Sequence, residues 1–473
     1  MSSIELTGWT GDTICAVSTP PGRGGIAVIR VSGPQALDIV QRRWQGKPLA
    51  DMATHTVHLG QLTDAAGEML DQAVLTVYRA PNSFTGEDVA ELACHGSTWI
   101  QQQVIQTLID AGCRHATAGE FTRRAFANGR MDLSQAEAVA DVIEAQSRAA
   151  HHVAMSQMRG RYSDELRGLR DKLLHFVALI ELELDFSEED VTFADRGEVT
   201  ALAHDIHSLI SRLADSYRDG NAIRNGMPVA IIGQTNAGKS TLLNALLRDD
   251  RALVSDIHGT TRDTIEDTID IQGVTFRFID TAGIRQTTDQ IEQIGIERTY
   301  AAINKARIIL WMIDTEPSPS ELQEMQERCK DKSLIIIQNK IDKEETTPEH
   351  SSHLSPLTSQ TSNLKSQTSN LLRISAKFGT NISEVEQAIF QAANIPAINS
   401  SDVIVNNARH YEVLTRANEH LQRVLDGLQQ QLSGDLLSED LRLTLNTLAE
   451  ITGGQITPNE VLGNIFKHFC VGK

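Results

Sequence analysis

Cysteine is scarce in this chain, and its spacing argues against two kinds of small structural framework. The 473 residues include five cysteines, at positions 15, 94, 113, 329 and 470. The number is odd and no pair has Cys-x-x-Cys spacing, so the sequence suggests neither a disulfide framework nor a zinc ribbon. Free thiols are typical of a reducing compartment.

Basic residues and long apolar runs are also lacking. Lys and Arg number 43 against 62 Asp and Glu, a net charge of −19. This argues against a generic polyanion binder, since non-specific affinity for nucleic acid comes from basic groups, but it leaves room for a local basic site. The longest apolar runs, such as residues 308–313, are far shorter than the roughly 20 residues of a membrane span. The first residues have no basic and apolar leader pattern, so the sequence predicts a cytoplasmic protein with no membrane partner.

The hydrophobic pattern changes along the chain. The first 127 residues mix strand-like runs, at 27–33 and 72–80, with turns rich in Gly and Pro, such as 19–25. From about residue 133 to 213 apolar side chains recur at helical spacing. This predicts an α+β N-terminal domain followed by a helical domain.

The second half of the chain begins with a different pattern. Five short apolar runs between residues 226 and 385 alternate with polar helical stretches, which is typical of an α/β domain, and we predict them as strands at 228–233, 274–280, 307–314, 333–338 and 371–375. Helical spacing returns after about residue 402. The simplest architecture inserts the α/β domain into one helical domain, because the termini of an inserted domain often lie close together. We therefore predict boundaries that give residues 1–127, 128–222, 223–385 and 386–473.

Two segments have unusual composition. Residues 343–372 are rich in Ser, Thr and Asn and contain SQTSNL twice, which predicts a flexible loop insertion in the α/β domain. Residues 181–190 contain six acidic residues in ten. We interpret them as a solvated helix end or loop in preference to a metal site.

The strongest motif is GQTNAGKS at residues 233–240, which fits G-x-x-x-x-G-K-[ST]. It follows a predicted strand and precedes a helical run, as the phosphate-binding loop of a P-loop protein requires. The glycines let backbone N–H groups approach phosphates, and the helix N-terminus favours the anion. Lys239 can bridge phosphate oxygens as a catalytic residue, and the Ser240 hydroxyl can bind Mg²⁺.

Four further motifs follow in order: GTTRD (259–263), DTAG (280–283), NKID (339–342) and SAK (375–377). Asp342 can accept two hydrogen bonds from guanine, and adenine lacks that donor pair, so the predicted nucleotide is GTP. The GTP-binding residues are then predicted to be Asn236, Ala237, Gly238, Lys239, Ser240, Thr241, Ser255, Asp256, Ile257, His258, Gly259, Thr260, Thr261, Asp280, Thr281, Ala282, Gly283, Asn339, Lys340, Asp342, Ser375, Ala376 and Lys377.

One expected group is missing from this set. Many small GTPases place a Gln directly after DTAG to orient the attacking water, but this chain has Ile284, which has no polar side-chain group. Another group must position water and another cation must offset charge. Asn236 and loop carbonyls at residues 255–260 could hold a monovalent cation. Glu292 could orient water, although taken by itself it is better interpreted as an exposed helix acid.

At this point the sequence resembles the MnmE (TrmE) family of bacterial and organellar tRNA-modification GTPases. The resemblance covers the chain apart from residues 343–372. Besides the GTP motifs it rests on the blocks PPGRGGIAVIRVSG (20–33), PNSFTGEDVAEL (81–92), GEFTRRAFANGRMDLSQAEAVADVIEA (119–145), IEQIGIERT (291–299) and VLGNIFKHFCVGK (461–473). It implies a tetrahydrofolate-binding-like N-terminal domain, a helical domain, and a P-loop GTPase domain with a mixed six-stranded sheet inserted into the helical domain.

The resemblance also implies roles for particular residues. Glu292 would orient water and Cys470 would be a functional cysteine. Ser240 and Thr261 would bind Mg²⁺. The positions implied for K⁺ are Asn236, Ser255, Ile257 and Thr260. Those implied for a folate derivative (5-formyl- or methylene-tetrahydrofolate) are Arg30, Glu91, Arg130 and Lys473, with Arg130 standing where the family often has Lys. A guanidinium and an ammonium are not interchangeable there.

The function implied is modification of tRNA. As a homodimer, with a flavin-dependent partner (MnmG, also GidA) in a heterotetramer, the family adds an aminomethyl-type or carboxymethylaminomethyl group at C5 of the wobble uridine, with a one-carbon unit from tetrahydrofolate. K⁺-dependent dimerisation of the G domains would drive GTP hydrolysis. The first alternative is a ribosome-assembly GTPase switch without modification chemistry. The second is a folate-dependent one-carbon enzyme in which the G domain is only structural.

Four arginines of the first 130 residues could contact tRNA: Arg114, Arg123, Arg124 and Arg130. For each of them an ion pair at a helix surface is at least as good an interpretation, and the basic surface for tRNA could instead belong to the partner protein.

Overall fold

The computed structural model describes residues 11–185, 196–234, 236–248, 267–279, 300–315, 317–343, 371–395 and 403–454, together with positions 462, 465–467, 469 and 472. The chain forms two compact units. Unit 1 comprises Met1–Glu144, Ala154–Asp215 and Arg409–Lys473, and unit 2 comprises Ala145–Val153 and Ser216–Ala408. Unit 2 is inserted in the sequence of unit 1, which agrees with the predicted insertion. The four residue boundaries given above stay a prediction.

The N-terminal part of unit 1 is built on a seven-stranded sheet in the order β3-β4-β5-β6-β2-β1-β7. Its strands are β1 (Ile14–Val17), β2 (Ile26–Ser32), β3 (Trp44–Gln45), β4 (Thr56–Thr63), β5 (Met69–Tyr78), β6 (Val89–His95) and β7 (Arg114–His115). All pairs are antiparallel except β1 with β7. Alternation of buried and exposed positions along β5 shows that the two faces differ.

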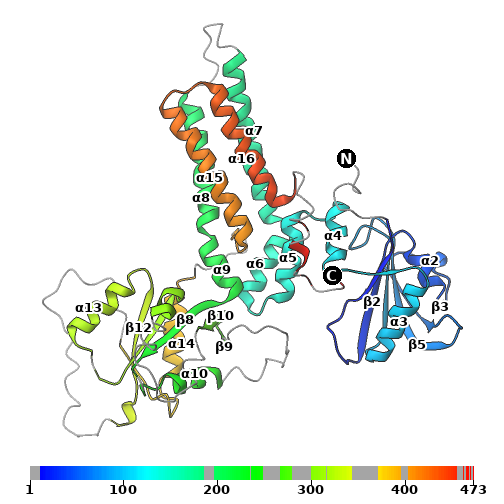
Figure 1. Cartoon of the computed structure of the whole chain (residues 1–473), viewed down its shortest axis with the longest axis horizontal. Coiled ribbons are helices and arrows are strands. Elements are labelled where there is room, and N and C mark those ends of the chain that lie inside the picture. The colour runs from blue at the N-terminus through cyan, green and yellow to red at the C-terminus, as the bar shows by residue number, and fades with distance from the viewer. Residues whose placement is uncertain are drawn as a thin grey trace. The chain divides into compact units, whose positions relative to one another are not determined.

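Helices α2 (Ala36–Gln41) and α3 (Thr98–Asp110) pack against one face, where apolar side chains of the strands form a single core (Figure 1). The opposite face, here called the open face, carries the strand residues that alternate with those of this core. Near β1 this face is covered by Phe121 of α4 (Glu120–Ala127), which packs on Ile14 and Ala16. Farther across, it carries Arg30 of β2 and Glu91 of β6, which are register partners.

The rest of unit 1 is helical. Its helices are α5 (Leu133–Glu144), α7 (Arg161–Asp185), α8 (Arg196–Asp215), α15 (Ala408–Gln429) and α16 (Gly434–Thr452), together with the second half of α6 (Arg148–Met158), whose first half belongs to unit 2. Long helix α7 packs against α8 and α16 (Figure 1). Arg409 of α15 forms a bidentate pair with Glu137 of α5 and donates to the carbonyls of Glu450 and Ile451 of α16. This one side chain therefore joins three helices.

Both ends of the described chain meet in unit 1. The Ser18 hydroxyl donates to the carbonyl of Gly472 at 3.0 Å. Gly472 has a φ of +96°, and a Cβ there would lie 2.2 Å from the carbonyl oxygen of Val17. Only glycine fits so close to this backbone.

Unit 2 contains a six-stranded sheet in the order β13-β12-β11-β8-β10-β9. The strands are β8 (Met227–Gly233), β9 (Asp267–Ile271), β10 (Val274–Phe278), β11 (Ile308–Ile313), β12 (Ser333–Gln338) and β13 (Leu372–Arg373). β9 is antiparallel to β10 and the other pairs are parallel. The mixed six-stranded sheet predicted from the resemblance is confirmed.

Helices surround this sheet in unit 2: α9 (Tyr217–Asn225), α10 (Lys239–Arg248), α13 (Pro319–Arg328) and α14 (Ile382–Ala393). Apolar residues of α10 and α14 form one core with the sheet, and a second core includes Ile303 and Cys329. Because its faces are covered, the strands β8 and β11 are almost continuously apolar. Among the described residues, no helix is both long and apolar enough to cross a membrane.

Candidate functional site

The described part of the nucleotide site lies where four parallel strands end. The phosphate-loop motif leaves β8 and enters α10, and the NKID and SAK motifs follow β12 and β13. The carboxyl ends of neighbouring parallel strands meet at one edge of a sheet, which is where α/β folds bind ligands. The topology therefore brings three separate motifs together.

The phosphate loop has the backbone that its residue types predict. Gly233 and Gly238 have φ of +148° and +96°, and Asn236 has +67°. A Cβ on Gly233 would lie 2.4 Å from the carbonyl oxygen of Met312, and one on Gly238 would lie 2.2 Å from Nδ2 of Asn339. Both glycines are therefore required by close packing as well as by conformation.

Lys239 is folded over this loop. Its Nζ donates to the carbonyls of Gly233 and Gln234 at 2.7 and 2.8 Å. Burial lowers the pKa of this ammonium group. A phosphate group in the loop would offer the ammonium a stronger, charged acceptor than these carbonyls.

Asn339 connects the phosphate loop to the SAK loop. Its Nδ2 donates to the carbonyl of Ala237 at 2.8 Å, and its Oδ1 accepts from the amide of Ala376 at 3.0 Å. The side chain is buried, so both ends of the amide are used within the protein. The sequence placed Asn339 in the site, and the structure gives it this bridging position.

Asp342 and Ser375 form the described part of the predicted base-recognition site. The Ser375 hydroxyl donates to Asp342 Oδ1 at 2.6 Å. This hydrogen bond, with smaller contributions from nearby lysines, lowers the pKa of the Asp342 carboxyl. The carboxylate is exposed and charged, as pairing with two guanine N–H groups requires.

The sequence reasoning missed Asp314, which lies just after β11. Its Oδ2 pairs with Nζ of Lys340 at 2.7 Å, and Lys340 has a φ of +70°. Its position directly after a buried parallel strand was the available signal.

Several predicted residues lie outside the described residues. These are Ser255, Asp256, Ile257, His258, Gly259, Thr260, Thr261, Asp280, Thr281, Ala282, Gly283, Glu292, Cys470 and Lys473, as well as the 344–370 part of the insertion and the acidic side chains at 182–190. The predicted Mg²⁺ and K⁺ positions are therefore represented only by Ser240, which opens α10, and Asn236. A hydroxyl and an amide oxygen are suitable donors for these hard cations.

A second polar site lies on the open face of the N-terminal sheet. Arg30 and Glu91 pair through two contacts to Glu91 Oε1, at 2.9 Å from Nε and 2.8 Å from an Nη. The Arg30 guanidinium lies over the rings of Phe84 and Phe121, at 5.3 and 5.6 Å. The Tyr78 hydroxyl donates to Glu91 Oε2 at 3.4 Å, and burial and the Glu91 charge raise the pKa of this tyrosine.

The structure describes three of the four residues predicted to bind a folate derivative. Arg30 and Glu91 are adjacent. Arg130 packs its aliphatic carbons near Gly86, whose Cβ would lie 3.2 Å from Arg130 Cγ. The sequence analysis missed three aromatic residues that lie beside the pair, because strand register and loop packing bring them there: Phe84, Phe121 and Tyr78.

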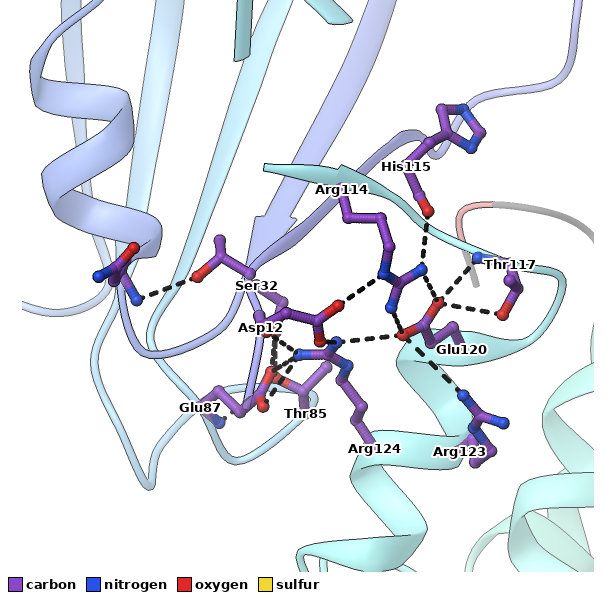
Figure 2. Close-up of polar contacts among 12 residues, drawn as sticks. Asp12, Ser32, Thr85, Glu87, Arg114, His115, Thr117, Glu120, Arg123 and Arg124 are labelled. Atoms are coloured by element: carbon purple, nitrogen blue, oxygen red, sulfur yellow. Dashed lines mark hydrogen bonds and ion pairs between the residues drawn. The ribbon is translucent and has the colours of Figure 1, made fainter. Parts of the chain in front are cut away.

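Two of the four arginines considered for tRNA are used inside the protein. Figure 2 shows Arg124 between Asp12, Glu87 and Glu120, and Arg114 between Asp12 and Glu120. Only 2% of the Arg124 side chain is exposed, so it is not available for contact with tRNA, and its ion pairs are buried where the sequence interpretation has them at a helix surface. The reason is that three carboxylates in this interior need a cation.

This network sets opposite pKa shifts on two buried glutamates. Burial alone would raise the pKa of Glu120, but hydrogen bonds from Arg114 and from the Thr117 amide, with the charges of Arg124 and Arg114, lower it to about 2. For Glu87 burial prevails over the charge of Arg124 and a hydrogen bond from Ser32, and the pKa is raised. The network is a structural support behind the open face.

Comparisons with known proteins show the family of this chain. A family model described as the MnmE helical domain matches residues 133–470, and one described as the GTP-binding protein TrmE N-terminus matches residues 13–130. The tRNA modification GTPase MnmE of Bacteroides thetaiotaomicron is 51% identical over 470 residues, covering 98% of this chain and 99% of that protein. The chain belongs to the MnmE family.

Another MnmE relative, from Cytophaga hutchinsonii, is 46% identical over 477 residues and covers all of both chains. A crystal structure of Era from Aquifex aeolicus matches 41% of this chain and 66% of that one, with 23% identity and a TM-score of 0.24. As an MnmE-family chain the protein is a GTPase, and the predicted family, fold class and enzyme class are confirmed.

Proposed function

We propose that this MnmE-family GTPase acts on tRNA, and that with a flavin-dependent partner (MnmG, also GidA) it adds an aminomethyl-type or carboxymethylaminomethyl group at C5 of the wobble uridine. The one-carbon unit comes from a tetrahydrofolate derivative bound by Arg30, Glu91, Arg130 and Lys473. The relatives that support the proposal are themselves named tRNA modification GTPases.

One observation carries the folate part of the proposal. A ribosome-assembly switch needs only the nucleotide site, yet this chain holds an Arg–Glu pair beside Phe84, Phe121 and Tyr78 on a separate domain. A pterin ring offers paired N–H donors that suit a carboxylate, and an aromatic face that suits this surrounding. Those features match the chemistry of Glu91 and its neighbours.

The GTPase part depends on cations. Mg²⁺, held by Ser240 and Thr261, would offset phosphate charge, and K⁺, held by Asn236, Ser255, Ile257 and Thr260, would supply the cation that an arginine finger gives in other GTPases. Glu292 orients the attacking water because Ile284 has no polar side-chain group. Hydrolysis accompanies K⁺-dependent pairing of two G domains in a homodimer.

Two measurements test these parts separately. Titration with 5-formyl-tetrahydrofolate should give saturable binding that Glu91→Gln weakens, whereas no saturable binding in the unchanged protein would favour the switch without modification chemistry. Mass analysis of wobble uridine from cells lacking the protein should show loss of the modification.

The catalytic assignment has its own test. GTP turnover should be much faster in K⁺ than in Na⁺, and Glu292→Ala should keep GTP affinity while turnover falls by about 100-fold or more. Equal rates in the two salts would remove the K⁺ assignment, and weakened GTP binding with intact turnover would remove that of Glu292.

A further inference from the structure

The loop between β5 and β6, residues 79–88, supplies one of the aromatic rings beside the Arg–Glu pair. The centroid of the Phe84 ring lies 5.3 Å from the Arg30 guanidinium, and 36% of this large apolar residue is exposed. The loop contains no helix or strand that would fix the ring. The position of Phe84 therefore depends on the contacts that its neighbours in the loop make.

The loop is closed by hydrogen bonds of its own. The amide of Ala80 donates to Oδ1 of Asp88 at 2.9 Å, and the Ser83 hydroxyl donates to the carbonyl of Glu87 at 2.6 Å. These bonds join the two ends of the loop and set its curvature. They do not by themselves attach the loop to the strand that carries Arg30.

Thr85 makes that attachment. It is completely buried, and its hydroxyl is hydrogen-bonded at 2.7 Å to the hydroxyl of Ser32 (Figure 2), which also donates to Oε2 of Glu87 at 2.6 Å. Ser32 lies two residues after Arg30 on β2, so both side chains are on the open face of the sheet. The Thr85 side chain thus holds the loop to β2 while the ring of the preceding residue lies beside Arg30.

Asn128 holds the loop from the other side. Its Nδ2 donates to the carbonyl of Thr85 at 2.7 Å. Asn128 is the residue that ends α4, and its own amide donates to the carbonyl of Arg124. The same helix places Phe121 at 5.6 Å from the Arg30 guanidinium. Helix α4 therefore reaches Arg30 directly through Phe121 and, through Asn128, by way of the loop.

The end of α4 also packs against the next residue of the loop. Gly86 has a φ of +78°, and a Cβ there would lie 3.2 Å from both Cβ of Asn128 and Cγ of Arg130. Arg130, one of the residues proposed to bind the folate, is therefore in contact with the loop that carries Phe84. Asn128 stands between these two residues in the chain order of contacts.

We propose that Asn128 is a positioning residue of the folate site, which acts on the ligand through Phe84. This rests on the proposed folate function and deepens it, because it states how the unliganded protein keeps the aromatic side of the pterin site in place. A loop that is already held in its binding conformation loses less conformational entropy when a ligand binds. Without the Asn128 hydrogen bond, part of the binding energy goes into ordering Phe84.

The experiment is a double-mutant cycle on the full-length protein, with the affinity for 5-formyl-tetrahydrofolate as the readout. Asn128→Ala should weaken binding by about 5-fold, the effect of one hydrogen bond, and Phe84→Ala by about 10-fold. In the Phe84→Ala background, Asn128→Ala should add no further loss, because the residue through which it acts is gone. A general loss of stability would not give this non-additivity.

Two further variants separate the hydrogen bond from the shape of the side chain. Asn128→Asp keeps the shape but places only acceptors opposite the Thr85 carbonyl, so it should weaken binding at least as much as Asn128→Ala. The matched control is Asn82→Ala. Asn82 is exposed in the same loop, and its side chain has no hydrogen bond to another described residue. This variant should leave the affinity unchanged.

Glu91→Gln distinguishes failure of the inference from failure of the folate function. If Glu91→Gln weakens binding and both Asn128 variants bind normally, the folate site stands and the positioning role is rejected. Equal losses from Asn128→Ala with and without Phe84, or a loss in Asn82→Ala as large as in Asn128→Ala, would also reject it. If the unchanged protein binds no folate, the proposed folate function fails and the inference fails with it.

Discussion

The nucleotide site takes its groups from loops that follow parallel strands of one sheet, whereas the N-terminal site takes side chains from the middle of antiparallel strands. In the first, short motifs such as GQTNAGKS and NKID keep the chemistry in consecutive residues. In the second, Arg30 and Glu91 are 61 residues apart and meet only through strand register. A loop site is thus local in sequence, and a sheet-face site is distributed.

The two sites also differ in what supports them. Behind the N-terminal site lies a buried ion network around Arg124. The nucleotide loops are instead joined by neutral hydrogen bonds of the Asn339 amide. Changes in the first should therefore affect stability, and changes in the second should affect ligand affinity.

The largest effect is expected for Arg124→Met. Removing this buried cation takes an ion-pair partner from Asp12 and from the buried Glu87 and Glu120, which should destabilise the N-terminal sheet by about 3–5 kcal/mol. Hydrogen exchange of β2 and β6 amides measures this loss. Arg123→Met is the control, because Arg123 is 3.9 Å from Glu120 and partly exposed, and it should cost less than about 1 kcal/mol. Equal losses of stability in the two variants would mean that the buried network stabilises the domain no more than an exposed ion pair does.

Acid should weaken the same domain through Glu120. Its pKa is about 2 in the folded protein against an ordinary 4.5, so its stabilising contribution is complete above about pH 4.5 and is lost as the pH falls toward 2. The contribution amounts to about 3 kcal/mol. Glu87, whose pKa is raised, acts in the opposite direction. Urea denaturation over a pH series should show that Glu120→Gln loses most of this acid dependence, and a parallel pH curve in the variant would contradict the assignment.

Gly238→Ala should lower GTP affinity by about 100-fold. The added Cβ would meet Nδ2 of Asn339 at 2.2 Å, and the φ of +96° disfavours any side chain. Gly379→Ala is the matched control, since Gly379 has a φ of +73° with open space around it. If isothermal titration gives the two variants the same affinity, backbone strain alone explains the effect and the contact with Asn339 does not matter.

The smallest effect is expected for Ser375→Ala. Asp342 then loses one hydrogen bond, which should weaken GDP binding by about 5-fold. Ser333→Ala removes a comparable hydroxyl, which donates to the Ala392 carbonyl, and should leave GDP affinity unchanged. A Ser375 variant that binds GDP normally would show that the hydrogen bond does not orient the carboxylate.

The comparison also explains what could be predicted from the sequence. The phosphate loop, Asn339, Asp342 and the mixed sheet were predicted, because each is encoded by adjacent residues in a fixed order of elements. The strand at 371–375 was predicted too long, since β13 covers only Leu372–Arg373. There the edge strand pairs with one neighbour, so few backbone bonds extend it.

The N-terminal domain was harder to predict in detail. β4 and β6 were not identified as strands, and neither interpretation of Arg124, a tRNA contact or a surface ion pair, included its burial. Whether an arginine on a helix contacts solvent or three carboxylates depends on Asp12 and Glu87, which lie 112 and 37 residues away. The sequence contains no local signal of such a meeting.

The contact of Ser18 and Val17 with Gly472 has a consequence for biosynthesis. Domains emerging from a ribosome generally fold in order, the N-terminal one first. Here the first strand receives its last backbone neighbour only after both helical segments and the entire nucleotide domain have been translated. The N-terminal domain, whose main core is built from residues 15–113, therefore gains this one contact late, and removal of Gly472 would take it away.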